Sequence, residues 1–399
     1  MARISTAGAF SSALQGILDR NAALVKTQNQ IATGKRINSP ADDPSGAVRA
    51  LDLDRALAEA NQFSRNSDAA TNRLSFEEQT LSDITTLLQN VRDTAVQGAN
   101  ATVDAGSRAA LAQQVQSRLD DLLSIANRKD ANGEYLFSGY KTLTQPFNQG
   151  TTGVQYAGDQ GVRLVQTSST QQIADGHSGY DVFMQIHEGN GTFVTSANAA
   201  NTGSGVISAG TVTNPGAWVQ GNYTLQLTTA TDYEIRDGSN TLVASGTYTS
   251  GNAIAFNGAQ FAITGTPAVG DRFGIDTSAT EDVFTTLQNL VTTLKQSNVT
   301  PAERARFDTQ MGAALTQLDQ ALDHVSSVRS EVGTRLNAID ETADSRDAQN
   351  VELNKSLSDL RDLDYAQAVT QLNLQLAGLQ AAQSSYTKIA QLSLFDYLR

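Results

Sequence analysis

The feature that most constrains the fold is a short segment near the N-terminus, residues 28–50, with the sequence QNQIATGKRINSPADDPSGAVRA. Gly34 suits the position just after a helix, since glycine adopts positive φ without steric cost. Pro40 cannot lie inside a helix, because it lacks a backbone N–H and clashes with the preceding turn. Asp43-Pro44 is typical of a helix start, with a capping carboxylate and a proline in the first turn. The segment therefore predicts a sharp joint between one helix and a second helix that begins directly after this proline.

Apolar residues at alternating spacings of four and three precede this joint and recur at the other end of the chain. The N-terminal series is Phe10, Leu14, Ile17, Asn21, Leu24, Gln28 and Ile31, and the C-terminal series is Tyr365, Val369, Leu372, Leu376, Leu379, Gln383 and Tyr386. This spacing is typical of the contact line of a coiled coil. Two terminal helices of the same type are expected to pair with each other.

Such a pair of helices should be only marginally stable alone. Each is about 33 Å long at about 1.5 Å per residue, and amide side chains interrupt the apolar line. We therefore expect the pair to gain stability by packing against copies of the same chain. The residues predicted to make this assembly contact are Leu14, Ile17, Leu24, Ile31, Leu372, Leu376, Leu379 and Tyr386.

Two proline-free stretches predict long helices in the rest of the chain. The chain has 6 prolines, and none lies between Ser45 and Gln145 or after Pro301. The sequence Thr300-Pro301-Ala302-Glu303 is a capping box with proline at the first helical position, which predicts the start of a very long helix. Apolar residues at helical spacing predict further helices over residues 45–97, about 111–125 and 281–296.

The middle of the chain has a different composition. Residues 149–278 hold 20 of the 31 glycines and no lysine. Short runs such as 223–227 and 260–264 alternate in polarity between turn signals, which predicts an all-β domain. Because this domain interrupts two helical stretches that belong together, we expect it to project outward from them. A turn at Asn132-Gly133 predicts that the following segment opens a hairpin against the helices.

The predicted fold is mainly α, with a long helical bundle, paired N- and C-terminal coiled-coil helices and an inserted, outward-facing all-β domain. The bundle and the terminal region each combine a part from before the insertion with a part from after it. The predicted domains are a terminal coiled-coil assembly region of residues 1–44 and 359–399, a long-helix bundle of residues 45–148 and 279–358, and a β insertion of residues 149–278.

Charge and residue usage exclude several functions. The net charge is −13 and the pI about 4.7, which argues against nucleic acid or an anionic membrane as the main partner. The chain has no cysteine, so disulfides, thiolate metal sites and thiol nucleophiles are excluded. No apolar run approaches the roughly 20 residues of a membrane span, and the N-terminus lacks the apolar core of a secretory signal. Composition alone would place the chain in the cytoplasm.

No group of residues predicts catalysis, a cofactor or a metal site. The chain has only three histidines, His177, His187 and His324. His187-Glu188 begins like a zinc-binding helix motif, but Gly191 stands where the second histidine is required. Asp42 and Asp43 form a carboxylate pair that capping of the following helix explains. The expected function is therefore assembly rather than turnover.

Motifs at both ends of the chain resemble a known family. The opening Arg3-Ile4-Ser5-Thr6, the joint segment TGKRINSPADDPSGAVRA and the paired terminal helices resemble the flagellin superfamily of bacterial axial proteins. Residues 133–142 (GEYLFSGYKT), followed by Pro146-Phe147, are more similar to the hook–filament junction members of that superfamily than to filament flagellin. The resemblance covers both ends and the part before the β insertion, whereas the middle is less specific.

The resemblance implies a structural subunit of the bacterial flagellum, not an enzyme and without a cofactor. Its implied partners are copies of itself, hook-associated junction protein 1, filament flagellin, a flagellar export chaperone and the type III export apparatus, and neither nucleic acid nor membrane. It implies an extracellular location, reached without a cleaved signal peptide. In such a subunit the terminal helices form the inner wall of a tubular helical lattice.

Two other functions stay open at this point. Filament flagellin is the nearest, because only the motif at residues 133–142 and the middle domain argue against it. A secreted adhesin or enzyme carried on the β domain is the second, and glycan binding or proteolysis by that domain would favour it. The number of copies in each flagellum, a single ring or a long filament, separates a junction subunit from flagellin.

Overall fold

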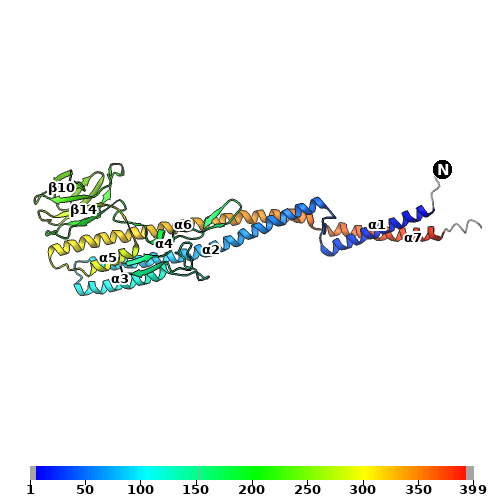
Figure 1. Cartoon of the computed structure of the whole chain (residues 1–399), viewed down its shortest axis with the longest axis horizontal. Coiled ribbons are helices and arrows are strands. Elements are labelled where there is room, and N and C mark those ends of the chain that lie inside the picture. The colour runs from blue at the N-terminus through cyan, green and yellow to red at the C-terminus, as the bar shows by residue number, and fades with distance from the viewer. Residues whose placement is uncertain (1–5, 152, 392–399) are drawn as a thin grey trace, which may run out of the picture. The chain divides into compact units, whose positions relative to one another are not determined.

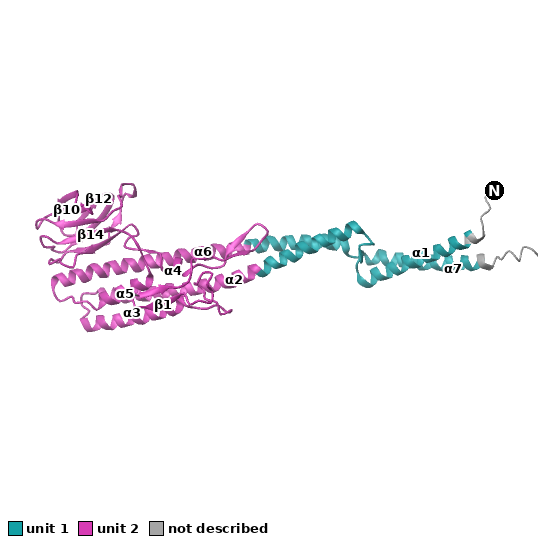
Figure 2. Cartoon of the chain, in the orientation of Figure 1, with its two compact units in different colours: residues 1–65, 341–399 teal, residues 66–340 magenta. Residues whose placement is uncertain are grey.

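The computed structural model describes residues 6–151 and 153–391 (Figure 1). It divides into two compact units: unit 1 combines residues 1–65 and 341–399, and unit 2 is residues 66–340 (Figure 2). Two helices continue from one unit into the other, α2 (Pro44–Ala99) and α6 (Pro301–Arg361). The predicted fold class, mainly α with long terminal helices and a β-rich middle, is confirmed.

Unit 1 contains the two terminal helices, α1 (Thr6–Thr33) and α7 (Tyr365–Gln391), with parts of α2 and α6. α1 ends where predicted, because Gly34 adopts a φ of +70°, a conformation that favours glycine. α2 begins at Pro44, and Asp43 caps it by accepting a hydrogen bond of 2.9 Å from the Gly46 amide. The predicted joint is therefore present.

Unit 2 contains two further helices, α3 (Ala105–Ala126) and α5 (Val283–Leu294). Each has an aspartate cap, Asp104 or Asp282, whose side chain accepts a hydrogen bond from the amide three residues further on. α6 starts with the predicted capping box. The Glu303 amide donates to Thr300 Oγ1 at 3.2 Å, and the Thr300 amide donates to the Glu303 carboxylate at 2.9 Å. Both exchanges satisfy amides that a helix start otherwise leaves unpaired.

Apolar side chains of α2, α3, α5 and α6 form one buried core in unit 2. Three aromatic rings join it from different segments: Phe147 lies 5.1 Å from both Phe183 and Phe284, and the last two are 5.8 Å apart, measured between centroids. Each fully buried leucine or phenylalanine stabilises the fold by about 1.5–3 kcal/mol relative to its exposed state. This core therefore holds the helices of unit 2 together without any disulfide.

Small hairpins and one short helix connect α3 to the β domain. They are β1 (Phe147–Gly150) paired with β2 (Gly153–Tyr156), β3 (Leu164–Gln166) paired with β4 (Gln172–Ala174), α4 (Gly179–Phe183), and β5 (Ile186–His187) paired with β15 (Thr280–Glu281). The β5–β15 pair brings the two ends of the β domain next to each other.

The hairpin predicted after Asn132-Gly133 is reduced to a turn with one antiparallel bridge, between Lys129 and Tyr135, and no strand is assigned in residues 133–146. Gly133 adopts a φ of +82°, and the Leu136 amide donates to the Arg128 carbonyl at 3.1 Å across the turn. Phe137 is fully buried in the helical core instead. The first hairpin begins later, at Phe147. The chain thus pairs across this turn by a single bridge, and Phe137 then enters the helical core.

The predicted range of the β insertion also combines two packing environments. Ile173, Val182 and Phe183 belong to the buried core of the helices, whereas the separate β core begins at Phe193. Periodicity and glycine content do not reveal which core a short strand joins. In addition, the division between the two compact units falls within the long helices, after residues 65 and 340. Continuous helices carry no sequence signal at such a boundary.

The β domain consists of antiparallel strands in two main sheets. The five-stranded sheet has the order β11–β10–β9–β14–β6, and β12, β13 and β7 form the second sheet, with β8 also pairing with β13. The strands are β6 (Phe193–Ala197), β7 (Val206–Ile207), β8 (Thr211–Val212), β9 (Tyr223–Leu227), β10 (Asp232–Asp237), β11 (Leu242–Thr247), β12 (Ala253–Phe256), β13 (Ala259–Thr264) and β14 (Arg272–Thr277), with a 3₁₀ turn η1 (Pro215–Ala217) before β9.

Alternate residues along the strands of the β domain point inward and form its hydrophobic core. In β9 the alternate residues Tyr223, Leu225 and Leu227 are buried and belong to a cluster separate from the helical core. The turn between β12 and β13 uses Asn257 and Gly258, both at positive φ, which is the tight hairpin turn that matches strand twist. The β domain therefore has a hydrophobic core of its own.

Candidate assembly interface

α1 and α7 pair within unit 1 and run antiparallel (Figure 1). The ring of Phe10 near the start of α1 contacts Tyr386 near the end of α7, with centroids 5.3 Å apart. At the other end, a Cβ on Gly34 would lie only 2.8 Å from the Tyr365 hydroxyl oxygen. The predicted pairing of the terminal helices is therefore present in a single chain.

Few side chains on the contact line between the two helices are fully buried. Among the residues of α1 and α7 whose burial the structure describes, only Leu24, Thr27 and Ala368 are exposed by less than 9%. The other residues on the line are half-buried: Phe10, Ile17, Ile31, Leu372, Gln375, Leu379, Ala382 and Tyr386. The pair thus lacks a closed core of its own, as expected from its sequence.

Six of the eight predicted contact residues lie on this line, and Leu14 and Leu376 do not. Leu14 is 48% exposed and Leu376 is 40% exposed. The line on α7 passes through Gln375, because the spacing Ala368, Leu372, Gln375, Leu379 also alternates four and three. Two registers of equal periodicity were available, and the packing of α1 selects the one that leaves Leu376 outside.

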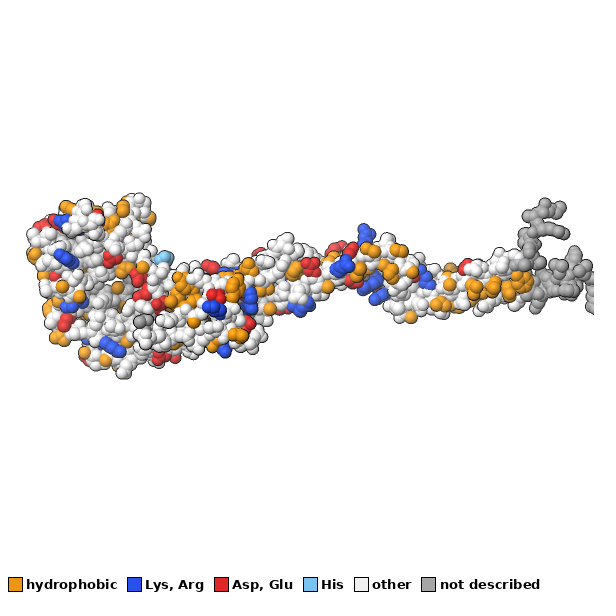
Figure 3. All heavy atoms as spheres, in the orientation of Figure 1, with side chains coloured by type: hydrophobic (Ala, Val, Ile, Leu, Met, Phe, Trp, Pro, Cys, Tyr) orange, Lys and Arg blue, Asp and Glu red, His pale blue; other side chains and the backbone are white. Residues whose placement is uncertain are grey.

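Six exposed apolar residues of α1 and α7 fall on two helix faces, and the space-filling view shows hydrophobic side chains exposed along the pair (Figure 3). We call Leu14, Leu18 and Val25 the α1 stripe, and Tyr365, Val369 and Leu376 the α7 stripe; each side chain is 40–54% exposed. Spacings of four and seven place each set on one helix face. Sequence reasoning missed Leu18 and Val25, although their spacing from Leu14 is the available signal.

A groove of about 600 Å³ adjoins the α1 stripe. It lies between α1 and the joint, and its walls combine apolar with amide and hydroxyl side chains: Leu18, Asn21, Ala22, Val25, Lys26, Asn29, Asn38, Ser39 and Asp42. Leu18 and Val25 of the α1 stripe also line this groove, so the stripe and the groove form one continuous surface.

Backbone hydrogen bonds clip the joint to the junction between α6 and α7. The Arg36 amide donates to the Arg361 carbonyl at 2.7 Å, and the Leu363 amide donates to the Gly34 carbonyl at 3.0 Å. The Arg36 guanidinium also donates to the Leu360 carbonyl at 2.6 Å. The joint between α1 and α2 and the junction between α6 and α7 therefore hold each other in place.

Asp42 closes the turn inside the joint, whereas its neighbour Asp43 caps α2 as predicted. The Asp42 carboxylate accepts the amides of Asn38 at 3.1 Å and Ser39 at 3.0 Å, and lies 3.0 Å from Lys26 Nζ. The hydrogen bond from Lys26, followed by those two amides, lowers the pKa of Asp42 to about 2. Its stabilisation of the turn is therefore present above the ordinary carboxylate range and is lost as the pH falls toward 2.

The histidines do not assemble into a site of the kind a catalytic triad needs. His177 lies between Glu77 and Glu331, His324 contacts the Asp181 carbonyl, and His187 belongs to β5. Within residues 6–151 and 153–391, no group of three or more His, Asp or Glu residues is placed to hold a metal ion. In the same residues, no helix is long and apolar enough to cross a membrane.

Two family models match the ends of the chain. Residues 4–142 match the bacterial flagellin N-terminal helical region, and residues 315–398 match the bacterial flagellin C-terminal helical region. These matches include α1, α7, the joint and most of the long helices. The stripes and the clipped joint thus lie in the parts of the chain that the flagellin family shares.

Known proteins resemble the whole chain. The flagellar hook-associated protein 3 of Escherichia coli is 27% identical over 400 residues, which cover 99% of each chain. Crystal structures of FlgL from Xanthomonas campestris and of the flagellar junction protein FlgL from Legionella pneumophila are 34% and 30% identical, each with a TM-score of 0.72. They cover 77% and 79% of this chain, and the chain covers 99% and 100% of them. Matches at both ends, full-length identity and the shared fold together show that this chain belongs to the FlgL, or hook-associated protein 3, family within the flagellin superfamily.

Proposed function

We propose that this chain is a structural subunit of the flagellar junction, and that it assembles when the α1 stripe of one copy packs against the α7 stripe of the next. The observation that supports this contact is the pair of exposed apolar stripes on unit 1, since aligned patches of this kind mark interaction sites. A half-exposed leucine or valine gains about 1 kcal/mol when it is covered. The six side chains together therefore contribute on the order of 5 kcal/mol, before the cost of association.

The presence of two different stripes favours a head-to-tail arrangement. A contact between unlike surfaces leaves one of each surface free, so copies add until a ring closes or a helical tube grows. A contact between two identical stripes would instead stop at a dimer. The tubular lattice expected from the sequence requires the first kind of contact.

The same kind of contact between terminal helices would join this chain to its other expected partners. Hook-associated junction protein 1 would lie on the hook side and filament flagellin on the filament side, each presenting terminal helices of the flagellin type. The chain would reach its extracellular place through the type III export apparatus, accompanied by an export chaperone. Membership in a flagellar family supports this proposal, as do terminal helices that bury little of their apolar surface in the single chain.

A charge on either stripe is expected to block assembly without unfolding the subunit. Leu18→Asp and Leu376→Asp would each place an unpaired carboxylate in the contact, which costs several kcal/mol when buried. Leu143→Asp is a matched control, because Leu143 is 82% exposed and belongs to unit 2. Swimming, filament attachment and flagellin leaked into the medium are measured in one strain for each variant. Normal swimming with both stripe variants would overturn the proposed contact, and a lowered melting temperature would show a role within the subunit.

The absence of cysteine allows a direct test of which stripes meet. Leu18→Cys and Leu376→Cys copies are assembled separately and as a mixture, then treated with a short thiol cross-linker. Head-to-tail packing predicts cross-linked dimers mainly in the mixture. Dimers of equal yield in the separate samples would favour contacts between identical stripes instead.

Filament flagellin stays the alternative function, since flagellins also match this chain over shorter or more divergent stretches. Counting labelled copies in each flagellum separates the two. A number sufficient for one short ring supports the junction subunit, and labelling along the whole filament supports flagellin.

A further inference from the structure

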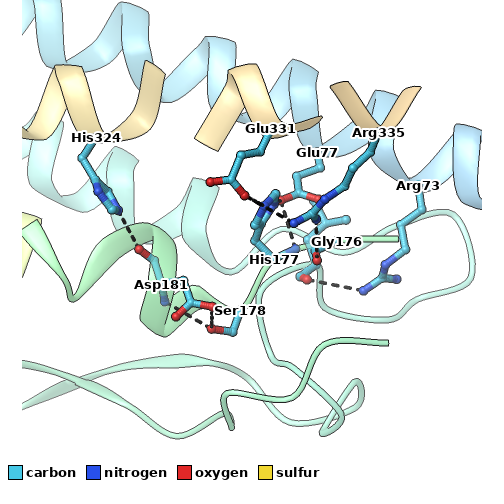
Figure 4. Close-up of polar contacts among 10 residues, drawn as sticks. Arg73, Glu77, Gly176, His177, Ser178, Asp181, His324, Glu331 and Arg335 are labelled. Carbon is cyan, nitrogen blue, oxygen red and sulfur yellow. Dashed lines mark hydrogen bonds and ion pairs between the residues drawn. The ribbon is translucent and has the colours of Figure 1, made fainter. Parts of the chain in front are cut away.

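A polar cluster in unit 2 ties three separate segments together around His177 (Figure 4). Residues 175–183, which we call the strap, follow β4 and include α4. His177 Nδ1 lies 2.8 Å from Glu77 Oε1 on α2, and its Nε2 lies 3.3 Å from Glu331 Oε2 on α6. The His177 side chain is only 8% exposed. One imidazole therefore connects the strap to two long helices.

Glu77 depends on this histidine. Its side chain is 2% exposed, and it accepts hydrogen bonds from both the ring and the backbone amide of His177. A buried carboxylate costs several kcal/mol unless a charged partner compensates it. An imidazolium supplies that charge, whereas a neutral imidazole supplies only a hydrogen bond.

The other charged groups around the strap already have partners. On α2, Arg73 pairs with Asp130 at 2.9 Å; on the strap, Asp175 pairs with Arg163 at 2.6 Å. On α6, Arg335 donates to the Gly176 carbonyl at 3.3 Å and lies 3.4 Å from Glu331. Asp181 accepts from Ser178 at 2.8 Å. His177 is therefore the group whose charge can change near neutral pH while it faces a buried carboxylate.

His324 is the second histidine that faces the strap. Its Nε2 lies 2.6 Å from the Asp181 carbonyl oxygen. That contact involves a neutral backbone acceptor and no carboxylate, so it does not require the charged form of the ring. His324 therefore serves as a control for His177.

We propose that the strap is a pH-sensitive clasp, closed while a charged His177 bridges Glu77 and Glu331 and loosened when His177 becomes neutral. The strap carries Val182 and Phe183 into the helical core, so loosening uncovers part of that core. It also lies just before β5, from which the β domain starts. The clasp thus controls how firmly the root of the β domain is held against α2 and α6.

The direction of the pH effect follows from the pKa of His177. Burial and the charge of Arg335 lower this pKa, but the hydrogen bond and charge of Glu77, together with the hydrogen bond to Glu331, outweigh them, so the pKa lies above its ordinary value of 6.5. A group whose pKa is raised in the folded state stabilises it most below the unfolded value, and the stabilisation is lost as the pH rises through the folded value. The clasp is therefore firmer in weakly acidic than in alkaline solution.

Hydrogen exchange of the full chain tests the clasp. Amide protection of the strap is compared at about pH 6 and about pH 8.5, corrected for intrinsic exchange rates, with β9 and β10 as internal reference. Each unit of pH between the folded and unfolded pKa changes the opening equilibrium by up to about tenfold. We expect strap protection to fall on going to the higher pH while the reference strands stay unchanged. Equal protection of the strap at both pH values would overturn the proposal.

Three variants test whether His177 causes the pH dependence of strap protection. His177→Gln should remove the pH dependence of strap protection, and His324→Gln should keep it. Glu331 is 58% exposed, so Glu331→Gln should fold normally and reduce the dependence without abolishing it. This variant keeps the test valid even if His177→Gln does not fold. A dependence that persists in His177→Gln, or that disappears in His324→Gln, would contradict the assignment.

Discussion

Gln375 shows how a single residue reveals the register of the terminal pair. Its side-chain oxygen is buried and has no hydrogen-bond partner among the residues that the structure describes. A buried polar atom without a partner costs about 1–3 kcal/mol. The register of the pair therefore leaves one polar atom of the contact line without a partner and Leu376 exposed. It is consistent with helices whose apolar surface serves a second contact.

Replacing this amide should strengthen the pair. We expect Gln375→Leu to stabilise the α1–α7 contact by about 1–2 kcal/mol, because it removes the unpaired oxygen and adds apolar contact. Hydrogen exchange of α7 amides in the monomer measures the gain. Gln380→Leu is the control, since Gln380 is exposed on the same helix and should change exchange little. Faster exchange in Gln375→Leu than in the natural chain would show that the amide has a partner in solution.

At the scale of elements, the β domain and the strap differ in how they depend on the helices. The β domain has its own core, which begins at Phe193 and ends with β14. The segment before it shares the core of α2 and α6. The two ends of the β domain lie next to each other, since the Ser278 amide donates to the Thr192 carbonyl at 3.0 Å.

Two deletions should therefore behave differently. Removing residues 193–277 and joining Thr192 to Ser278 with a short glycine linker should leave the helices of unit 2 folded, because no residue of the helical core is lost. Removing residues 149–278 also deletes Val182 and Phe183, and losing one buried phenylalanine alone typically costs about 3–5 kcal/mol. Circular dichroism and thermal unfolding compare the two variants. Equal melting temperatures would show that the strap contributes nothing to the helical core.

At the scale of the whole molecule, the two units differ in charge. Unit 2 has 15 basic and 27 acidic residues, a net charge of −12, whereas unit 1 has 13 basic and 14 acidic residues, a net charge of −1. The unit that carries the proposed assembly surface is thus nearly neutral overall, and unit 2 is strongly acidic. Copies that assemble must overcome repulsion between their acidic units.

Assembly should consequently become stronger as salt is added. Charges on different copies are screened beyond a Debye length of about 8 Å near physiological ionic strength, and over a shorter range at higher salt. We expect light scattering to show more assembly in sodium chloride at about 0.5 M than at about 0.05 M. Sucrose of equal osmolality is the control, since it excludes volume without screening charge. Assemblies that dissolve in salt would show that ion pairs between copies dominate the contact.

Local signals in the sequence were sufficient for the long helices, for several of their ends and for the fold class, whereas α3 begins at Ala105, before the predicted residue 111. Gly34, Asp43 and the capping box at Thr300 act through a few neighbouring atoms, so their residue types predict the structure directly. The pairing of α1 with α7 also follows from periodicity, because two matching apolar lines have few other partners.

Where the periodicity of the sequence allows more than one arrangement, tertiary packing decided between them. A four-three spacing fits both Leu376 and Gln375 on the contact line of α7, and only the position of α1 excludes Leu376. Short apolar strands do not reveal whether they join the helical core or the β core, so the place of residues 149–187 came from long-range contacts. The clasp at His177 joins residues 100 and 154 positions apart. No local pattern predicts such a contact, because its energy depends on burial that exists only in the folded chain.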